Sequence, residues 1–417
     1  RMHPYYSPYA NDEEGKHYGL TNFQNPLARS DADVSGYRKE RKKLFNGVFS
    51  LKYDMPFIPG LSAKVLFSYL TKVEEFKTFA KEFKLYSYDK ESGKYNTVFT
   101  GNSPSNLTRK DYTQEQNMLQ FSLNYNRTLL DKHNVQALFL YEQREDLDDY
   151  LQAYRQFAID ALDQINSGSD KNKNNAGVAS ELANASFVGR INYDYDNKYL
   201  FEANIRADAS SRFSPDNRWG YFPSLSAAWR LSEEDFMENT NEWMNNLKIR
   251  GSWGFLGNQN ALNDYYPWMN TYSIGANYPF NNNLSTGYYQ KNYRLASISW
   301  EKARTWGIGL DMTLMNKINF SMDYYDRKTT DIIMDVPVPS EFALGAYKDN
   351  VGAMVNRGIE IALGYNNRWK DWSLSVNGNF TYNRNEIMNL GGVQRMINGN
   401  DIKQIGSPIN SYYAYKA

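Results

Sequence analysis

The side chains that could perform chemistry are present, but none stands at a catalytic or metal-binding spacing. The three histidines, His3, His17 and His133, form no pair with metal-ligand spacing. Two acidic groups, 146–149 and 233–235, are the nearest approach to the paired carboxylates of glycoside hydrolysis. Both fall in predicted loops, where neighbouring carboxylates are usually solvated. No phosphate loop, nucleophile elbow or H-E-x-x-H motif occurs. We therefore expect no enzyme, no catalytic residue, no bound metal and no cofactor.

The residue types that remain are those that bind sugars or peptides. The segment 258–294 is dense in Tyr, Trp and Asn. Aromatic faces combined with amide donors and acceptors are what oligosaccharides and extended peptides need. We expect substrate contacts from Tyr265, Tyr266, Trp268 and Tyr272. The alternative is that these rings pack against neighbouring loops or against a partner protein.

A second polar segment, SSRFSPDNRWGYFPS, covers residues 210–224. Arg212 and Trp219 could hydrogen-bond to and stack on a sugar or peptide, and we include both among the candidate substrate-binding residues. The alternative, which we favour, is structural. In that case Arg212 and Arg218 pair with carboxylates and lock the segment between two strands.

The elements that must position these residues are strands. Apolar and polar residues alternate in about twelve segments of roughly nine to eleven residues. In 304–314, for example, Ile308, Leu310 and Met312 alternate with Gly309 and Asp311. Such strands are long for a globular protein, and about ten tilted residues cross a bilayer. The predicted strands are 44–53, 61–71, 117–128, 134–143, 186–196, 198–208, 222–230, 247–255, 304–314, 317–326, 356–367 and 371–382.

The composition agrees with strands that bury only alternate residues. Mean hydropathy is −0.71, yet aromatic residues make up 16% of the 417 residues, whereas disordered chains are poor in aromatics. Lys plus Arg equals Asp plus Glu at 47 each, so no net field favours nucleic acid. There is no cysteine, which excludes a disulfide scaffold. No apolar run of about 18 residues exists, so no transmembrane helix is expected.

The connections between the predicted strands alternate in length. Short connections fall at 55–60, 129–133, 197, 315–316 and 367–370, and long ones at about 72–116, 144–185, 209–221, 256–303 and 327–355. Outer-membrane barrels show this pattern, with short periplasmic turns and long extracellular loops. Two segments break the strand pattern: 233–248 predicts a short amphipathic helix at the periplasmic rim, and 147–165 also predicts a helix, inside a long loop.

Three stretches, 187–237, 247–259 and 299–363, resemble the barrel of SusC/RagA-like TonB-dependent transporters. The most specific motifs are SSRF…NRWGYFPS and the spaced set Asn350, Gly352, Met354, Asn356, Gly358 and Glu360. The resemblance implies an all-β fold, an antiparallel transmembrane β-barrel of about 22 strands, of which this chain is an internal fragment. It places 1–43 in an extracellular loop region and 44–417 in the partial barrel. The plug and terminal strands are expected to be missing, which accounts for the absence of a signal peptide.

The resemblance also implies a function in the bacterial outer membrane. The expected activity is TonB-dependent import of an oligomeric nutrient, a glycan rather than a peptide. The expected partners are a SusD-like lipoprotein, the TonB complex acting through the missing plug region, the oligosaccharide or oligopeptide substrate, and outer-membrane lipid. Nucleic acid is not an expected partner. Two alternatives stay open: a passive porin-like barrel and a soluble all-β glycan-binding protein.

Overall fold

The computed structural model describes residues 7–11, 17–20, 25–262, 264–280, 282–290, 293–336, 338, 341 and 345–414. His3 therefore lies outside the described residues. The chain divides into two compact units. The first comprises residues 1–48, 68–117 and 146–181, and the second comprises residues 49–67, 118–145 and 182–417.

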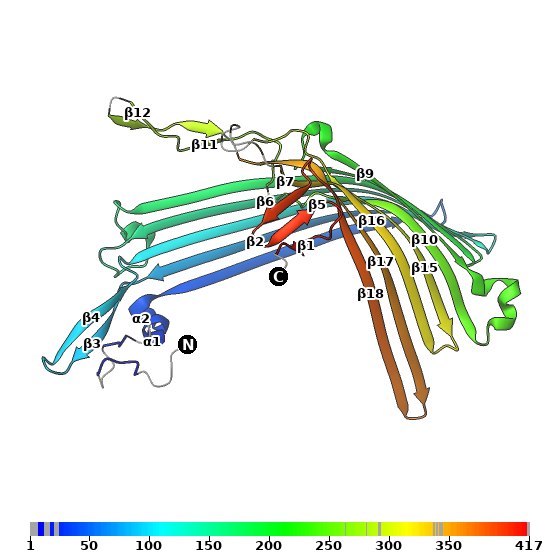
Figure 1. The fold of residues 1–417 in the computed structure, drawn as a ribbon, viewed down its shortest axis with the longest axis horizontal. Coiled ribbons are helices and arrows are strands. Elements are labelled where there is room, and N and C mark those ends of the chain that lie inside the picture. The colour runs from blue at the N-terminus through cyan, green and yellow to red at the C-terminus, as the bar shows by residue number, and fades with distance from the viewer. Residues whose placement is uncertain are drawn as a thin grey trace. The chain divides into compact units, whose positions relative to one another are not determined.

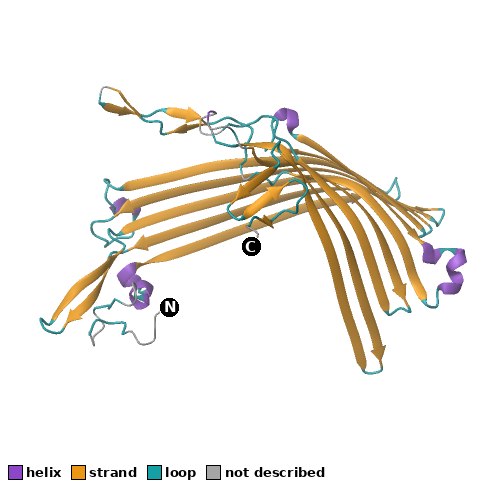
Figure 2. Cartoon of the chain, viewed as in Figure 1, coloured by secondary structure: helices purple, strands orange, loops and turns teal. Residues whose placement is uncertain are grey.

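Strands dominate the described structure, and the helices are few and short (Figure 2). The helices are α1 (Pro26–Ser30) and α2 (Ala32–Ser35), with single 3-10 turns at Ile165–Ser167, Pro215–Asn217, Leu231–Glu233 and Asp235–Thr240. One sheet has twelve strands in the order β1-β2-β5-β6-β7-β8-β9-β10-β15-β16-β17-β18. Their bounds are β1 (Gly36–Asp54), β2 (Leu61–Ala80), β5 (Asn106–Leu129), β6 (His133–Gln156), β7 (Lys173–Tyr195), β8 (Tyr199–Ser210), β9 (Trp219–Arg230), β10 (Met244–Asn258), β15 (Glu301–Leu314), β16 (Ile318–Val336), β17 (Tyr347–Trp369) and β18 (Trp372–Leu390).

Nine shorter strands form four small ladders. Their bounds are β3 (Phe83–Asp89), β4 (Lys94–Gly101), β11 (Tyr272–Ile274), β12 (Tyr278–Phe280), β13 (Asn283–Ser285), β14 (Tyr288–Gln290), β19 (Arg395–Asn398), β20 (Asp401–Gln404) and β21 (Ser411–Tyr412). The pairings are β3 with β4, β11 with β14, β12 with β13, and β19 with β20 and β21. All of them lie in the connections between strands of the large sheet or after β18.

All twelve predicted strands are confirmed: each overlaps one strand of the large sheet and extends beyond it by at most one residue. Within the second unit the pairings from β7 to β18 are antiparallel, and each strand pairs with the next large strand along the chain. Figure 1 shows β9, β10, β15, β16, β17 and β18 side by side in this order, from green to orange-brown. Alternation at period two predicts this arrangement because both faces of each strand keep a constant character.

The predicted strand lengths were wrong. β5 and β6 have 24 residues each, and β16 has 19, so the strands run well into the segments predicted as long loops. The reason is visible at 72–78 and 108–116, where charged and polar residues occupy both faces. Hydropathy no longer alternates there. The backbone hydrogen bonds of the strands continue, because polar side chains on both faces can be solvated by water.

The helix predicted at 147–165 was also wrong. Residues 147–156 continue β6, and only Ile165–Ser167 form a 3-10 turn. Leu147, Tyr150, Leu151 and Tyr154 fit a helical face, but a spacing of four residues also fits a strand. Cross-strand contact decides the outcome, since Tyr150 stacks on Tyr112 with ring centroids 4.5 Å apart.

Two other boundaries differ from expectation. In 233–248 the structure has 3-10 turns at Leu231–Glu233 and Asp235–Thr240, after which β10 begins at Met244. The region 1–43, predicted as a loop, contains α1, α2 and the start of β1 at Gly36. Asn25 caps α1 by accepting hydrogen bonds from the amides of Leu27 and Ala28.

The short predicted connections are tight turns. The turn after β7 has positive φ at Asp196 and Asn197, and the turn after β15 has positive φ at Met315 and Asn316. Each turn has three residues between its last paired residues, and two successive residues with positive φ suit the twist of the flanking strands. One end of the second unit is therefore closed by short hairpins, whereas the other carries long connections such as 259–300.

The buried apolar clusters are small and lie in the long connections and strand ends. In the second unit Phe213, Phe222, Leu262, Ile298 and Trp300 form one such cluster. The described residues of the first unit form two such clusters. One consists of Ala28, Phe83 and Leu85, and the other of Phe79, Leu107 and Phe157. Between these clusters the sheet keeps many large apolar side chains exposed, so its apolar face is not a protein core.

Candidate functional site

The wall formed by β10 and β15 to β18 has one apolar face. Ile249 lies opposite Leu310, which lies opposite Met322 on the next strand. Met322 in turn lies opposite Ile361, and Ile361 lies opposite Phe380. The register therefore carries apolar residues across five strands without interruption. Because this row is not covered by the described chain, it is suited to contact lipid.

The neighbouring row, on the other face of the same strands, is polar. Arg250 lies opposite Gly309, which lies opposite Asp323. Asp323 then lies opposite Glu360, and Glu360 lies opposite Thr381. Charged residues thus occupy the face that the apolar row leaves free, as expected for the water-filled side of a barrel wall.

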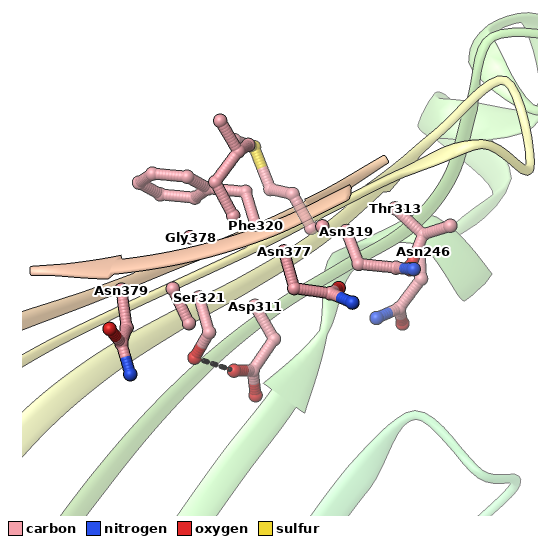
Figure 3. A pocket seen from close by; sticks show the side chains of 13 residues that line it. Asn246, Asp311, Thr313, Asn319, Phe320, Ser321, Asn377, Gly378 and Asn379 are labelled. Atoms are coloured by element: carbon pink, nitrogen blue, oxygen red, sulfur yellow. Dashed lines mark hydrogen bonds between the residues drawn. The ribbon is translucent and has the colours of Figure 1, made fainter. Parts of the chain in front are cut away.

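Figure 3 shows the two faces directly at a hollow of about 530 Å³ in this wall. Phe320 lies on one side of the strands, whereas Asp311, Ser321, Asn377 and Asn379 lie on the other. Ser321 donates a hydrogen bond to Asp311 at 2.9 Å. The amides and hydroxyl of this face present both donors and acceptors, which suits contact with water or with a polar solute.

An ion-pair network crosses three strands on the polar face. The Arg250 guanidinium donates from Nε to Asp311 Oδ2 at 3.0 Å and from Nη1 to Asp323 Oδ1 at 2.6 Å. Lys248 Nζ lies 3.2 Å from Asp311 Oδ2. Two carboxylates and two cations are thereby balanced, and Arg250 ties β10 to β16 across β15.

Gly309 provides the space for this network. A Cβ atom at Gly309 would lie 2.5 Å from Cζ of Arg250 and 2.7 Å from Oδ1 of Asp323. Any larger residue would therefore push the guanidinium away from its partner. The glycine is required here for a close approach rather than for an unusual backbone angle.

A larger hollow of about 670 Å³ continues along the same polar face. Its lining includes Glu202, Lys248, Arg250, Asp323 and Glu360. A hollow with both signs of charge can form hydrogen bonds to a polar solute without selecting an anion or a cation. The described residues contain no group of three or more His, Cys, Asp or Glu side chains that could hold a metal ion.

The long connections bring together three of the six predicted substrate-binding residues. The Arg212 guanidinium lies over the ring of Tyr265 at 5.4 Å and donates a hydrogen bond to the Leu262 carbonyl. Trp268 Nε1 donates to the Ser211 carbonyl at 3.5 Å. The partners of Arg212 are thus a ring and a carbonyl, not the carboxylates that the structural alternative predicted.

The backbone of Tyr266, a fourth predicted residue, takes part in the same cluster. Its carbonyl accepts a hydrogen bond from Arg294 Nη1 at 2.8 Å. Arg294 also pairs with Asp264 at 2.6 Å. The connection 259–300 is therefore fastened to itself at its base by one arginine.

The other two predicted residues lie elsewhere. Trp219 is 41% exposed and stacks on Phe187 with ring centroids 5.9 Å apart. Tyr272 is 71% exposed and lies opposite Gln290 in the β11–β14 ladder. Neither contacts the cluster around Arg212, so the six residues do not form one site.

The sequence analysis missed the contacts that hold the segment 210–219 in place. Trp300 Nε1 donates to the Arg218 carbonyl at 3.0 Å. Ser214 Oγ and Asn217 Nδ2 donate to the Ala296 carbonyl at 2.8 and 3.1 Å. The segment is locked, as the structural alternative proposed, but through hydrogen bonds between side chains and carbonyl groups about eighty positions apart in the chain.

A further hollow of about 350 Å³ lies beside this cluster and was also missed. It is lined by Asp264, Arg294, Asp335, Tyr347 and Lys348, among others. Lys348 pairs with Asp335 at 3.1 Å. The sequence shows these charged residues in the long loops. Only the fold brings the ion pairs Arg294–Asp264 and Lys348–Asp335 to the same hollow.

The motif at 350–360 has a structural role at its first residue. Asn350 Nδ2 donates to the carbonyls of Ser299 and Asp331 at 2.9 and 2.7 Å, and its Oδ1 accepts from the Ser299 amide at 2.8 Å. A single side chain thereby fastens β17 to β16 and to the residue two positions before β15. Gly358 lies against the Tyr325 ring, where a Cβ would be 2.6 Å from Cζ.

No helix in the described part of the chain is both long and apolar enough to cross a membrane.

Comparison with known proteins agrees with the geometry. The family described as "TonB dependent receptor-like, beta-barrel" matches residues 3–411. TonB-dependent receptor P39 of Formosa agariphila is 30% identical over 399 residues, which cover 94% of this chain and 36% of P39. TonB-dependent receptor SusC of Bacteroides thetaiotaomicron is 35% identical over 251 residues, which cover 55% of this chain and 25% of SusC.

Among solved structures, the RagAB peptide importer in its closed-closed state superposes with a TM-score of 0.79 at 23% identity. The match covers 95% of this chain and 42% of the RagAB chain, and it shows a shared fold. The chain thus spans well under half the length of these relatives. Its strands, faces and family match agree, and the chain belongs to the TonB-dependent receptor-like β-barrel family of the outer membrane, as a SusC/RagA-like member.

Proposed function

We propose that the chain forms part of the wall and the long connections of a transporter that imports an oligomeric nutrient, driven by TonB. The observation that carries this proposal is the pair of faces on β10 and β15 to β18. An uninterrupted apolar row crosses five strands, and an ion-paired polar row lies on the other face. A wall with this pattern separates lipid from a wet interior.

The two ends of the second unit support a sidedness for this wall. The tight turns, such as those at Asp196 and Met315, fit the periplasmic side, and the long connections fit the extracellular side. In this orientation the cluster around Arg212 and the hollow beside Arg294 face the outside, where a nutrient arrives.

The substrate proposed is a glycan. The extracellular connection carries the exposed rings of Tyr272, Tyr278 and Tyr288, and the Asn270 side chain accepts a hydrogen bond from Gln290. Flat rings beside amides suit the apolar faces and hydroxyls of sugars. An oligopeptide is the second candidate, favoured by the fold shared with the RagAB peptide importer.

The partner proposed is a SusD-like surface lipoprotein that closes over the long connections. The projecting ladders β11–β14 and β12–β13 present large exposed side chains, including Ile274 and Leu284. Aliphatic groups of this size suit a protein surface better than a sugar. The exposed rings and aliphatic groups share a face of the β11–β14 ladder, where Ile274 lies opposite Tyr288, so we place the lid and the substrate next to each other on the connection 259–300.

The test uses the full-length transporter together with its lid lipoprotein. The complex is screened against oligosaccharide and oligopeptide libraries, and uptake of any ligand is measured in cells with and without a protonophore. Binding of glycans with uptake that stops when the proton gradient collapses is the expected result. Binding of peptides alone overturns the glycan assignment, and uptake that persists without the gradient supports the passive porin instead.

A further inference from the structure

β1 carries a run of cations on the same face as its apolar residues. Lys39, Arg41, Lys43 and Phe45 occupy alternate positions of β1 and therefore share one face. The Phe45 ring lies 6.3 Å from the ring of Tyr69 on β2. The apolar character of this face continues along β1, because the next residues at alternate positions include Phe49, Leu51 and Tyr53.

One carboxylate on β2 serves several of these cations. Glu75 accepts a hydrogen bond from Lys43 Nζ at 2.8 Å, and its other oxygen lies 3.9 Å from Arg41 Nη1. Arg109 of β5 is also near enough to help lower the pKa of Glu75, after the larger effect of the Lys43 hydrogen bond. Lys39 has no such carboxylate among its described contacts and lies 4.5 Å from the centre of the Tyr37 ring. Positive charge is therefore in excess on this face.

The opposite face of the same strands is closer to balance, with three cations and two carboxylates. Lys42 Nζ lies 2.8 Å from Glu40 and 3.4 Å from Glu74. Lys72 Nζ also lies 2.8 Å from Glu74. Arg38 lies over the ring of Phe76 at 5.3 Å. Two carboxylates serve the cations there, so the larger excess of positive charge is a property of one face and not of the run of basic residues as such.

We propose that Lys39, Arg41 and Lys43 bind the phosphate groups of phosphorylated lipids at the edge of the outer membrane. Lys43 stands two residues from Phe45, which is about 7 Å along a strand, so the cations begin where the lipid-facing apolar residues end. The side chains of Arg41 and Lys43 are 71% and 57% exposed, which leaves their donors accessible. Lys and Arg at this depth attract anionic headgroups.

The occupant is a lipid rather than a free anion because the cations are open on one side. They line a flat strand face and not an enclosed cavity, so an anion in solution would keep most of its water and gain little. A lipid phosphate is different, because its acyl chains would lie against the neighbouring rings of Phe45 and Tyr69. The apolar contact holds the phosphate at the height of the cations, and the two interactions support each other.

The test measures lipid binding by the full-length transporter in a neutral detergent. The protein is titrated with phosphatidic acid, with phosphatidylcholine of the same chain length and with inorganic phosphate, and thermal unfolding is followed. We expect phosphatidic acid to bind most tightly, with an affinity that falls as salt rises. Each cation near a membrane surface contributes about a fivefold gain in affinity, so a triple Lys39→Gln, Arg41→Gln, Lys43→Gln variant loses on the order of 100-fold.

The opposite face supplies a matched control of equal charge change. Arg38→Gln, Lys42→Gln, Lys72→Gln should leave phosphatidic acid binding unchanged within about threefold, since separations approaching the Debye length are well screened. Glu75→Gln adds a test in the opposite direction, because removal of the shared carboxylate should tighten binding. Equal losses in the two triple variants overturn the proposal. So does an unfolding shift with inorganic phosphate as large as that with phosphatidic acid, or weaker binding by Glu75→Gln.

Discussion

The wall of β10 and β15 to β18 and the cluster at the base of the connection 259–300 belong to the same unit, but different rules hold them together. In the wall, each contact follows from register, and one apolar row and one polar row repeat at period two. In the cluster, the contacts are single hydrogen bonds from Arg212, Trp268, Trp300 and Arg294 to distant carbonyls.

This difference between the wall and the cluster predicts which residues tolerate substitution. A wall residue is defined by its face, so an exchange between faces should disturb membrane assembly, while the identity of the side chain matters less outside the ion-pair network of Arg250. A cluster residue is defined by one partner, so a small chemical change should matter locally and leave the barrel intact. Four variants, taken from the largest expected effect to the smallest, test this distinction.

The largest effect is expected from a charge on the lipid-facing row. Phe380→Arg should destabilise the assembled barrel by roughly 2–4 kcal/mol if it lies near the bilayer midplane, and by less toward the interface. The adjacent Asn379→Arg, on the polar face, is the matched control and should cost little. Folding into lipid vesicles followed by denaturant titration measures both. Equal losses would show that the two faces do not differ in their surroundings.

A smaller effect is expected from the ion-pair network. Arg250→Gln leaves Asp311 and Asp323 without their shared guanidinium and should cost about 1–3 kcal/mol. The same titration measures it. Gly309→Ala should displace the guanidinium, so its cost should shrink when it is combined with Arg250→Gln. If the two costs are fully additive, Gly309 does not act by providing space for the Arg250 guanidinium.

The cluster should respond locally. Trp300→Phe removes the hydrogen bond to the Arg218 carbonyl but keeps most of the ring in the buried cluster, at a cost of about 1 kcal/mol. We expect faster proteolysis within 259–300 and no change in the unfolding of the barrel. A loss of barrel stability of the same size would instead show that the cluster contributes to the stability of the wall.

The smallest effect concerns pH, at the connection 231–243. Hydrogen bonds from Tyr199 and Trp229 hold the pKa of Glu234 below its ordinary value. A depressed pKa means that the carboxylate stabilises the fold above its unfolded pKa, and that this is lost as pH falls through the folded pKa. Wild type should therefore exceed Glu234→Gln in thermal stability near neutrality. The difference should begin to shrink as pH falls below about 4.5 and should disappear once pH is below the folded pKa, whereas a constant difference would contradict this origin.

The sequence predicted the wall well because its information is local. Alternation in 304–314 and 317–326 fixes which residues share a face, and the connections predicted at Asn197 and at Met315 and Asn316 fix where strands reverse. Strand ends were not predictable in the same way. At 72–78 polar residues on both faces remove the alternation, although the backbone continues to pair.

The cluster could be predicted only in part. Its residue types, arginine beside tyrosine and tryptophan, were recognisable, and Arg212, Tyr265, Tyr266 and Trp268 do gather there. Their partners were not, because Trp300 and Arg218 are brought together by folding of the intervening strands. Trp219 shows why the motif 210–224 does not predict the members of the cluster. Its position beside Phe187 follows from the strand face on which it lies and not from the motif.

The most direct measurement uses the absence of cysteine from this sequence. Single spin labels are attached at successive positions of β16 in the full-length transporter in lipid bilayers, through Asn319→Cys, Phe320→Cys, Ser321→Cys, Met322→Cys and Asp323→Cys. Collisions with oxygen, which dissolves in lipid, are compared with collisions with a water-soluble nickel chelate. We predict that oxygen accessibility peaks at 320 and 322 and nickel accessibility at 319, 321 and 323. If the two profiles rise and fall together, or if neither alternates, β16 does not separate lipid from a wet interior.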